Sequence, residues 1–497
     1  MLQPMPTSVR WIPIAERGCL AVFFAWLAAL PLPFGSVVEG ARLSLIAVPL
    51  ALCTIAALLR FYATRDRANT AQPTRAWTIW GAGGFLFIAA GALQLVPLPP
   101  SLLAAISPES AAIWTRASAV AALAGVRTGT AHPVTIDPAA TTLELFRMVG
   151  LLATFTCSAL LVRHHIRRML LAAVLCLAAL FETFYGVREA VIQRYAIWGW
   201  VNRLIFNRVT GTFVNPNHFA HYIAIVLPMA MFLIAISWRD AGPPQVKVMR
   251  RLAMLVEHQL FRVGFALLAV GACLAALLLA SSRGALLALA AGFLGCGALL
   301  PGRRVARVTL AAAAGIIVLT ALVFFLGIGR TVGRFTPSAG ERETFGGRRV
   351  GITAAVRVWE RFSIMGSGLG TFARVVSMEQ REDLDRLYNH AHNDYIELAA
   401  TAGTLGIVIA LVTLLGGYVT LVRMTFGASS KELSWRRRAF QAAALTSILI
   451  AMVHALVDFN FFIPANPATL VAIAGAAVAT IDHDLRARRV PIAVDAS

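Results

Sequence analysis

The chain has 497 residues, of which 58% are hydrophobic and 14% are charged, and its mean hydropathy is +0.73. Soluble domains are about half apolar and about a quarter charged, so this composition excludes an ordinary soluble fold and indicates a polytopic membrane protein. The net charge is +20, almost all from arginine. Because the arginines are scattered between apolar segments, nucleic acid is disfavoured, and we expect membrane lipids and a phosphorylated substrate as partners.

Long apolar segments recur along the chain and predict an all-α membrane protein with about twelve transmembrane helices. The first segment follows Arg10 and Arg17, and we expect it to be retained as a helix rather than removed as a signal peptide. The six cysteines lie in or beside apolar segments without a CxxC pair, which favours buried packing over disulfides or a metal site. The expected spans are 18–35, 41–60, 77–96, 142–162, 169–188, 219–238, 262–280, 284–300, 308–328, 396–422, 439–458 and 467–481.

Alternate connections between these spans carry the clusters of arginine and lysine, and the positive-inside rule places those connections in the cytoplasm. Both chain ends are then expected in the cytoplasm as well. The connections that face outward are expected at residues 97–141, 189–218, 281–284, 329–395 and 459–466.

The outer loop 329–395 is unusual because it holds ten arginines. A long loop is exported despite its charge, so the topology stands, and an anionic substrate on that face would explain the excess. The alternative is a solvated surface on which acidic residues balance the arginines. Residues 350–362 predict an amphipathic helix, and the glycines at 366, 368 and 370 predict a tight turn that seats the loop on the membrane.

Three polar segments are expected to meet on the outer face. The first leads into the span at 219 and contains Arg208, Asn215, Asn217 and His218. A helix N-terminus beside an arginine suits a phosphate oxyanion, although Asn217 would also serve as an ordinary helix cap. The second is the turn around Arg283, whose guanidinium must either snorkel or pair and is able to bind a diphosphate bidentately.

The third segment, 388–397, is the richest in ionisable groups, and such a cluster at a membrane boundary suggests a functional site. His392 is the candidate base for an acceptor hydroxyl, with Asp394 or Glu397 orienting it, and His390 is the rival base. A zinc site is disfavoured because three ligands at suitable spacing are not visible. The further candidates for substrate binding in this segment are His390, Asn393, Asp394 and Glu397.

Two arginines and a histidine on one face indicate transfer from a pyrophosphate donor. The arginines would stabilise the leaving group, and the histidine would activate a sugar hydroxyl. We expect no cofactor, because the pyrophosphate bond already carries the energy. Asp458, with His454 one turn earlier, is a further candidate for this site, the alternatives being a helix-end carboxylate and a buried, hydrogen-bonded histidine.

These segments resemble the O-antigen ligase and O-antigen polymerase superfamily of bacterial envelope glycosyltransferases. The resemblance implies a GT-C-like helical fold in the bacterial inner membrane with a periplasmic active site. It also implies metal-independent, inverting transfer from undecaprenyl-pyrophosphate glycan, with Arg208 and Arg283 binding the pyrophosphate and His392 as the base. The resemblance covers about 205–470, and its motifs are residues 208–217, 282–284, 369–372, 392–397 and 454–466.

The expected organisation has N-terminal transmembrane helices in 1–204, a catalytic membrane region in 205–481 that includes the periplasmic loop, and a cytoplasmic tail in 482–497. Three acceptors stay open: lipid A–core, another lipid-linked repeat as in O-antigen or exopolysaccharide polymerases, and a pilin serine or threonine. A lipid-linked glycan flippase and a scaffold without chemistry are alternatives of other classes. The flippase is disfavoured because no internal repeat is visible and the polar groups gather at one face.

Overall fold

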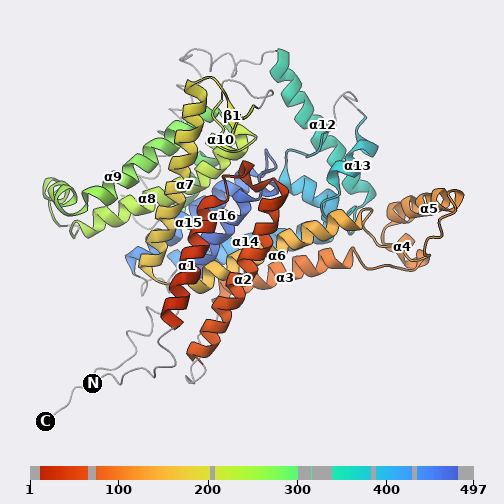
Figure 1. Ribbon diagram of the computed structural model, residues 1–497, viewed down its shortest axis with the longest axis horizontal. Helices are drawn as coiled ribbons and strands as arrows, with labels where there is room; N and C mark the ends of the chain where they lie inside the picture. The colour runs from red at the N-terminus through yellow and green to blue at the C-terminus, as the bar shows by residue number, and fades with distance from the viewer. Residues whose placement is uncertain are drawn as a thin grey trace, which may run out of the picture.

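The computed structural model describes residues 12–64, 74–201, 208–243, 245–299, 315, 339–381, 388–427 and 434–479. This part of the chain is mostly helical, with one small hairpin of β1 (Ala196–Ile197) and β2 (Trp200–Val201) (Figure 1). Within it, eight helices are long and apolar enough to cross a membrane. The chain is therefore a multi-pass membrane protein, while the full number of spans and the GT-C likeness stay predictions.

The long apolar helices follow the expected segments, and further helices lie in the connections between them. The first group is α1 (Ile12–Ala29), α2 (Glu39–Thr64), α3 (Arg75–Leu93), α4 (Pro100–Ile106), α5 (Pro108–Leu123), α6 (Pro138–Leu161) and α7 (His165–Val191). The second is α8 (Pro216–Asp240), α9 (Val248–Ala280), α10 (Arg283–Leu299), α12 (Ala339–Arg361), α13 (Phe372–Glu379), α14 (Asp394–Phe426), α15 (Trp435–His454) and α16 (Ala465–Val478). The expected span 308–328, apart from residue 315, and the tail 482–497 lie outside the described residues.

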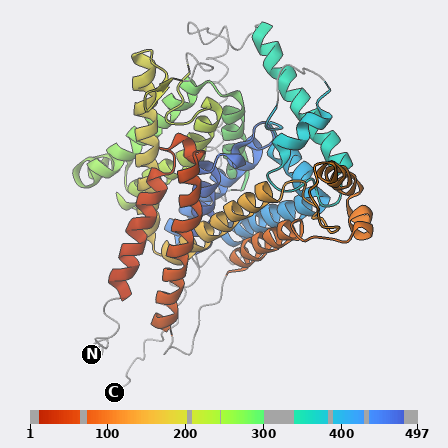
Figure 2. The same ribbon diagram turned by 45° about the vertical axis from the view of Figure 1, so that its right-hand side comes forward.

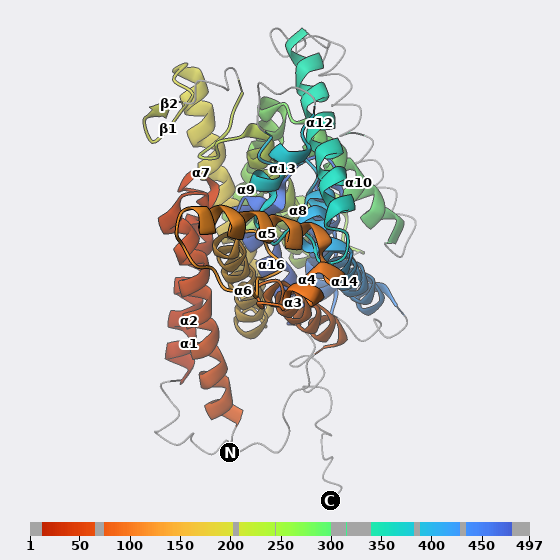
Figure 3. The same cartoon turned by 90° about the vertical axis from the view of Figure 1, so that its right-hand side faces the viewer.

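Two differences from the sequence expectation have local causes. The first helix ends at Ala29 rather than near residue 35, because Pro31, Pro33 and the left-handed Gly35 (φ 70°) follow it. The connection 97–141 contains α4 and α5, which were not expected because they are short and only moderately apolar. Figure 1 shows both helices beyond the ends of α3 and α6, and in Figure 3 they lie in front of the bundle, toward the viewer.

The early and late helices form one bundle. Helix α6 packs against α2 and α16, and α3 packs against α14. Glycines allow these close approaches: a Cβ on Gly150 would lie 2.3 Å from the Leu45 carbonyl oxygen, and one on Gly475 would lie 2.3 Å from that of Phe155. Small residues at such contacts let helix backbones approach within a membrane. Helix α8 is buried along most of its length among α7, α9 and α15.

The outer loop forms a small helical unit at one end of the bundle, where Figure 2 shows α12 and α13 together. Its own apolar core includes Ala354, Val358, Phe372 and Val375, all buried. The expected glycine turn is present, with φ of 76°, 116° and 76° at residues 366, 368 and 370. A Cβ on the middle glycine would lie 2.0 Å from Thr135 Oγ1, so this turn seats the loop on the segment before α6.

Helix α14 has 33 residues but is broken at Gly403, which has φ 68° and ψ −175°. A straight helix of this length would span about 50 Å, well beyond a hydrocarbon core of about 30 Å. At the break, the backbone N–H groups of Thr404 and Leu405 donate to the carbonyls of Ser363 and Ile364, at 2.8 and 3.1 Å. Before the break, the backbone N–H groups of Ser367 and Gly368 donate to the carbonyls of Ala400 and Thr401 at 3.1 and 3.0 Å, so the outer loop also holds the first turns of α14.

Candidate functional site

The segment before α8 is fixed by a buried carboxylate on α7. Glu182 accepts hydrogen bonds from the backbone N–H and the hydroxyl of Thr212, each at 2.7 Å. The adjacent Gly211 has φ 55°, and a Cβ there would lie 2.3 Å from Glu182 Oε2. Only a glycine allows this approach, so the loop that carries Arg208 is held firmly on the bundle.

Arg208 links two helix ends. Its Nε donates to the Ala280 carbonyl at 2.8 Å, and its Nη2 donates to the Ser281 carbonyl at 3.2 Å and to Oδ1 of Asn217 at 2.9 Å. Asn215 caps α8, because its side chain accepts from the Asn217 backbone N–H at 2.8 Å. The Arg208 guanidinium is thus oriented by the turn that directly precedes Arg283.

Arg283 begins α10 directly after that turn, where Ser281 has φ 50°. The next residue is Gly284, and a Cβ there would lie 2.9 Å from Nε2 of His454 and 2.9 Å from a methyl group of Val457. The glycine therefore lets α10 start against the end of α15. His454 is buried, and its Nδ1 lies 2.9 Å from Nδ1 of His221 on α8.

A polar cavity of about 130 Å³ lies where these segments meet. Among its described lining residues are three arginines and a single carboxylate, so its walls carry a net positive charge that suits an anion. The polar lining includes Arg208, Arg283, Arg348, Asn217, His454 and Asp458.

Asp458 is the buried carboxylate of this cavity and lies beyond the end of α15, outside the membrane-spanning helices. Asn217 Nδ2 donates to its Oδ2 at 3.0 Å, and Nδ1 of His392 lies 3.3 Å from its Oδ1. His218 Nε2 and Arg348 Nη2 each lie 3.8 Å from a carboxylate oxygen. Burial alone would raise the pKa of Asp458, but the imidazoles of His218 and His392 and the charge of Arg348 outweigh it and hold that pKa well below its usual range.

His392 lies in the left-handed backbone region, with φ 53°. This conformation is strained for a residue other than glycine, and such strain is concentrated at functional sites. Asn393 stabilises it, because its side chain caps α14 and its Nδ2 donates to the Leu456 carbonyl at 2.9 Å. With Nδ1 directed at Asp458 and a quarter of the side chain exposed, Nε2 is the nitrogen left to accept a proton.

His390 has a different carboxylate partner. Its Nδ1 lies 2.8 Å from Oε1 of Glu397, whose other oxygen accepts from the Ala391 backbone N–H at 2.8 Å. The Asp394 carboxylate accepts from the Phe461 backbone N–H at 3.2 Å. Neither Asp394 nor Glu397 therefore orients His392, contrary to the prediction from the sequence, because the carboxylate facing His392 belongs to Asp458, 66 residues later.

Two residues of the site were not singled out from the sequence. Phe459 contacts three imidazoles: it stacks on His390 with ring centroids 4.1 Å apart, and meets His392 and His218 edge-on at 4.9 and 4.5 Å. Arg348, on α12, lines the cavity. The excess of arginine in the outer loop was the available signal, but it did not distinguish Arg348 from its neighbours.

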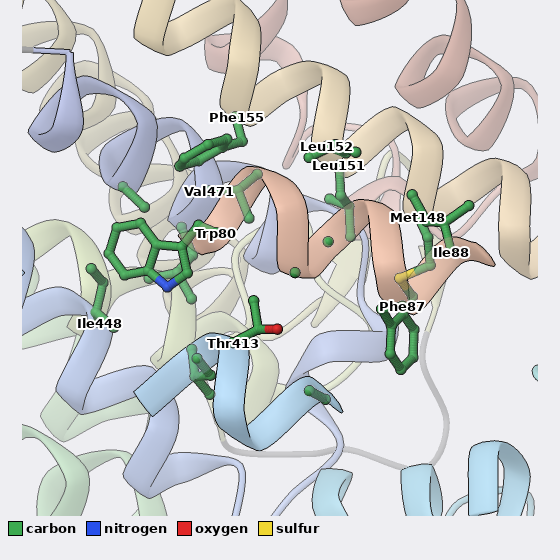
Figure 4. A pocket seen from close by; sticks show the side chains of 16 residues that line it. Trp80, Phe87, Ile88, Met148, Leu151, Leu152, Phe155, Thr413, Ile448 and Val471 are labelled. Carbon is green, nitrogen blue, oxygen red and sulfur yellow. The ribbon is translucent and has the colours of Figure 1, made fainter. Parts of the chain in front are cut away.

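A larger cavity, of about 240 Å³, lies within the membrane-spanning region between α3, α6, α14, α15 and α16. Figure 4 shows Trp80, Phe155, Leu152 and Thr413 around it. Its described lining residues include no titratable side chain. The smaller arginine-lined cavity is therefore the candidate site for chemistry.

The fold and this cavity define a multi-pass membrane protein with a polar, positively charged site formed by several helix ends. Residues 268–411 match the family model described as O-Antigen ligase, so this part of the chain is similar to the superfamily that the motifs resemble. The match contains Arg283, the glycine turn and His392, whereas Arg208 and Asp458 lie outside it. No curated protein matches the chain. The family match supports activity of the O-antigen ligase or polymerase type in general terms.

Proposed function

We propose that this protein transfers glycan from an undecaprenyl-pyrophosphate donor to an acceptor hydroxyl at the periplasmic face of the bacterial inner membrane. The proposal rests on one observation, which is that Asp458 contacts both parts of the site. Its carboxylate lines the arginine cavity and also faces Nδ1 of His392. A leaving-group site and a candidate base are thereby joined through one buried anion.

In this proposal Arg208 and Arg283 bind the pyrophosphate. The planar guanidinium group offers paired donors that match phosphate oxygens, and it stays charged at any physiological pH. As the glycosidic bond breaks, negative charge grows on the departing pyrophosphate, and the arginines stabilise it. Because Arg208 is held by the Ala280 carbonyl and by Asn217, this donor site is largely preorganised.

His392 accepts the proton of the acceptor hydroxyl on Nε2. The hydroxyl oxygen attacks the anomeric carbon of the donor sugar, the bond from that carbon to the pyrophosphate oxygen breaks, and undecaprenyl pyrophosphate leaves. Asp458 fixes the imidazole tautomer and stabilises the imidazolium that forms. Attack opposite the leaving group inverts the anomeric centre.

The link through Asp458 favours His392 over His390 as the base. His390 is paired with Glu397 and stacked on Phe459, which suits a residue that orders the segment. The outer loop would shape the acceptor site, with lipid A–core, a lipid-linked repeat and a pilin hydroxyl as the candidate acceptors.

The test uses purified protein in nanodiscs supplied with undecaprenyl-pyrophosphate oligosaccharide and each of the three acceptors separately. We expect transfer to one acceptor, and a loss of roughly 10²-fold or more in His392→Ala and Arg283→Ala. The exposed Arg116 on α5 provides the matched control, as Arg116→Ala should retain full transfer.

Full transfer by both site variants would disprove this assignment of residues. If no acceptor is glycosylated while the donor lipid crosses the bilayer, the protein is a transporter and the proposed function is wrong.

A further inference from the structure

We propose that Arg348, on the outer-loop helix α12, is a third diphosphate-binding residue that makes the site selective for a diphosphate over a monophosphate lipid. This inference rests on the proposed function and concerns the same cavity. Arg348 reaches the cavity from the outer loop, whereas Arg208 lies in the connection before α8 and Arg283 at the start of α10.

Arg348 makes no hydrogen bond to Asp458. The separation of 3.8 Å between its Nη2 and Oδ2 of Asp458 is an electrostatic contact, longer than a hydrogen bond. Its Nε is buried and has no hydrogen-bond partner among the described residues. Buried donors are nearly always satisfied, so this nitrogen, on a residue that lines the cavity, can donate to an acceptor bound there.

Helix α12 holds Arg348 in a defined place. One turn further along, a Cβ on Gly351 would lie 3.3 Å from the His390 carbonyl oxygen, so α12 packs directly on the segment that carries the candidate base. Ala354 and Ala355 on the same helix are fully buried. Positions three apart share a helix face, so Arg348 lies on the same face of α12 as Gly351, one turn earlier. The adjacent Arg349 is exposed.

The charge of the cavity matches a diphosphate. Its described lining residues include three arginines, and its carboxylate, Asp458, already faces His392 and His218. Among the described lining residues, three guanidinium groups therefore stand beside one carboxylate. Two linked phosphoryl groups offer more acceptor oxygens and more charge than one, so the third arginine should contribute most to a diphosphate.

The test compares Arg348→Ala and Arg348→Lys with Arg349→Ala as the matched control. Binding of undecaprenyl pyrophosphate and of undecaprenyl monophosphate is measured with the full chain in nanodiscs, together with the unfolding temperature and the transfer rate. For Arg348→Ala we expect a rise of about tenfold or more in the Kd for the diphosphate, since a hydrogen bond to a charged group is lost. The Kd for the monophosphate should change much less, Arg348→Lys should recover part of the affinity, and Arg349→Ala should behave as the wild type.

The outcomes separate this inference from the proposed function. If Arg348→Ala binds the diphosphate as the wild type does while Arg283→Ala has lost it, the inference about Arg348 is wrong and the proposed function stands. Equal losses for both lipids with a lowered unfolding temperature would assign Arg348 a structural role and overturn the inference. If the wild type neither binds the diphosphate lipid nor transfers glycan, both proposals are wrong.

Discussion

Nδ1 of His392 lies 3.3 Å from Oδ1 of Asp458, although 66 positions separate the two residues along the chain. Two hydrogen bonds to the backbone that precedes Asp458 maintain this pairing. The backbone N–H of Asp394 donates to the Ala455 carbonyl at 2.9 Å, and Asn393 Nδ2 donates to that of Leu456 at 2.9 Å. Because these two bonds do not involve the side chains of His392 and Asp458, both side chains can be substituted with the connection between the segments intact.

The two histidines of the site should respond differently to substitution. We expect His392→Ala to lower kcat by roughly 10²-fold or more, because it removes the proton acceptor. His390→Ala should lower it far less, since its partner Glu397 mainly orders the local backbone through Ala391. Transfer rates at saturating donor, with unfolding temperatures as the check on folding, measure the difference. A more severe loss in His390→Ala would reverse the assignment.

Asp458 should give stability a specific dependence on pH. The folded state depresses the pKa of this carboxyl, so its contribution to the free energy of unfolding is fully present above the unfolded value of about 3.9. That contribution is lost as the pH falls through the folded value. We therefore expect the unfolding temperature of the wild type to exceed that of Asp458→Asn at pH 7, and the difference to shrink below about pH 4. A difference that grows in acid would contradict the depressed pKa.

Gly284→Ala should disturb the arginine turn. The added methyl group would lie 2.9 Å from His454 Nε2 and from a methyl group of Val457, and overpacking of this kind costs about 1–3 kcal/mol. We expect a lower unfolding temperature and slower transfer. Gly271→Ala on α9 is the matched control, since nothing lies within 4 Å of its Cβ position. Equal behaviour of the two variants would show that α10 and α15 are not in close contact.

Glu182→Ala should weaken donor binding from a distance. The substitution leaves the backbone N–H of Thr212 without its buried acceptor, at a cost of about 1–3 kcal/mol, while the Thr212 hydroxyl keeps the Pro31 carbonyl at 2.7 Å as an acceptor. The loop that carries Arg208 then loses its anchor, so the KM for the donor should rise more than kcat falls. Glu257→Ala, at an exposed glutamate on α9, should change neither. An unchanged KM for the donor in Glu182→Ala would show that this carboxylate has no effect on donor binding.

The helices were largely predictable from the sequence because a bilayer leaves a long apolar segment few other structures. Helices α4 and α5 were not, since their apolar content resembles that of an ordinary connection. The meeting of Arg208, Arg283 and His392 at one site followed from the alternation of charged connections. The pairing of His392 with Asp458 could not be predicted from the sequence. It depends on how α14 and α15 pack, which no local sequence pattern indicates. Arg348 could not be predicted either, because the outer loop contains ten arginines and no sequence pattern distinguishes this one from the others.

The break at Gly403 also has a practical meaning for exchanging parts between related chains. Hydropathy places the start of this span near residue 396, and a chimera joined there would separate the first turns of α14 from the loop. Yet Thr404 and Leu405 bond to Ser363 and Ile364 across the break, so the loop and these turns act as one cassette. A graft that carries the loop together with residues through Leu405 keeps these contacts within the grafted segment, and leaves Arg208 and Arg283 with the recipient.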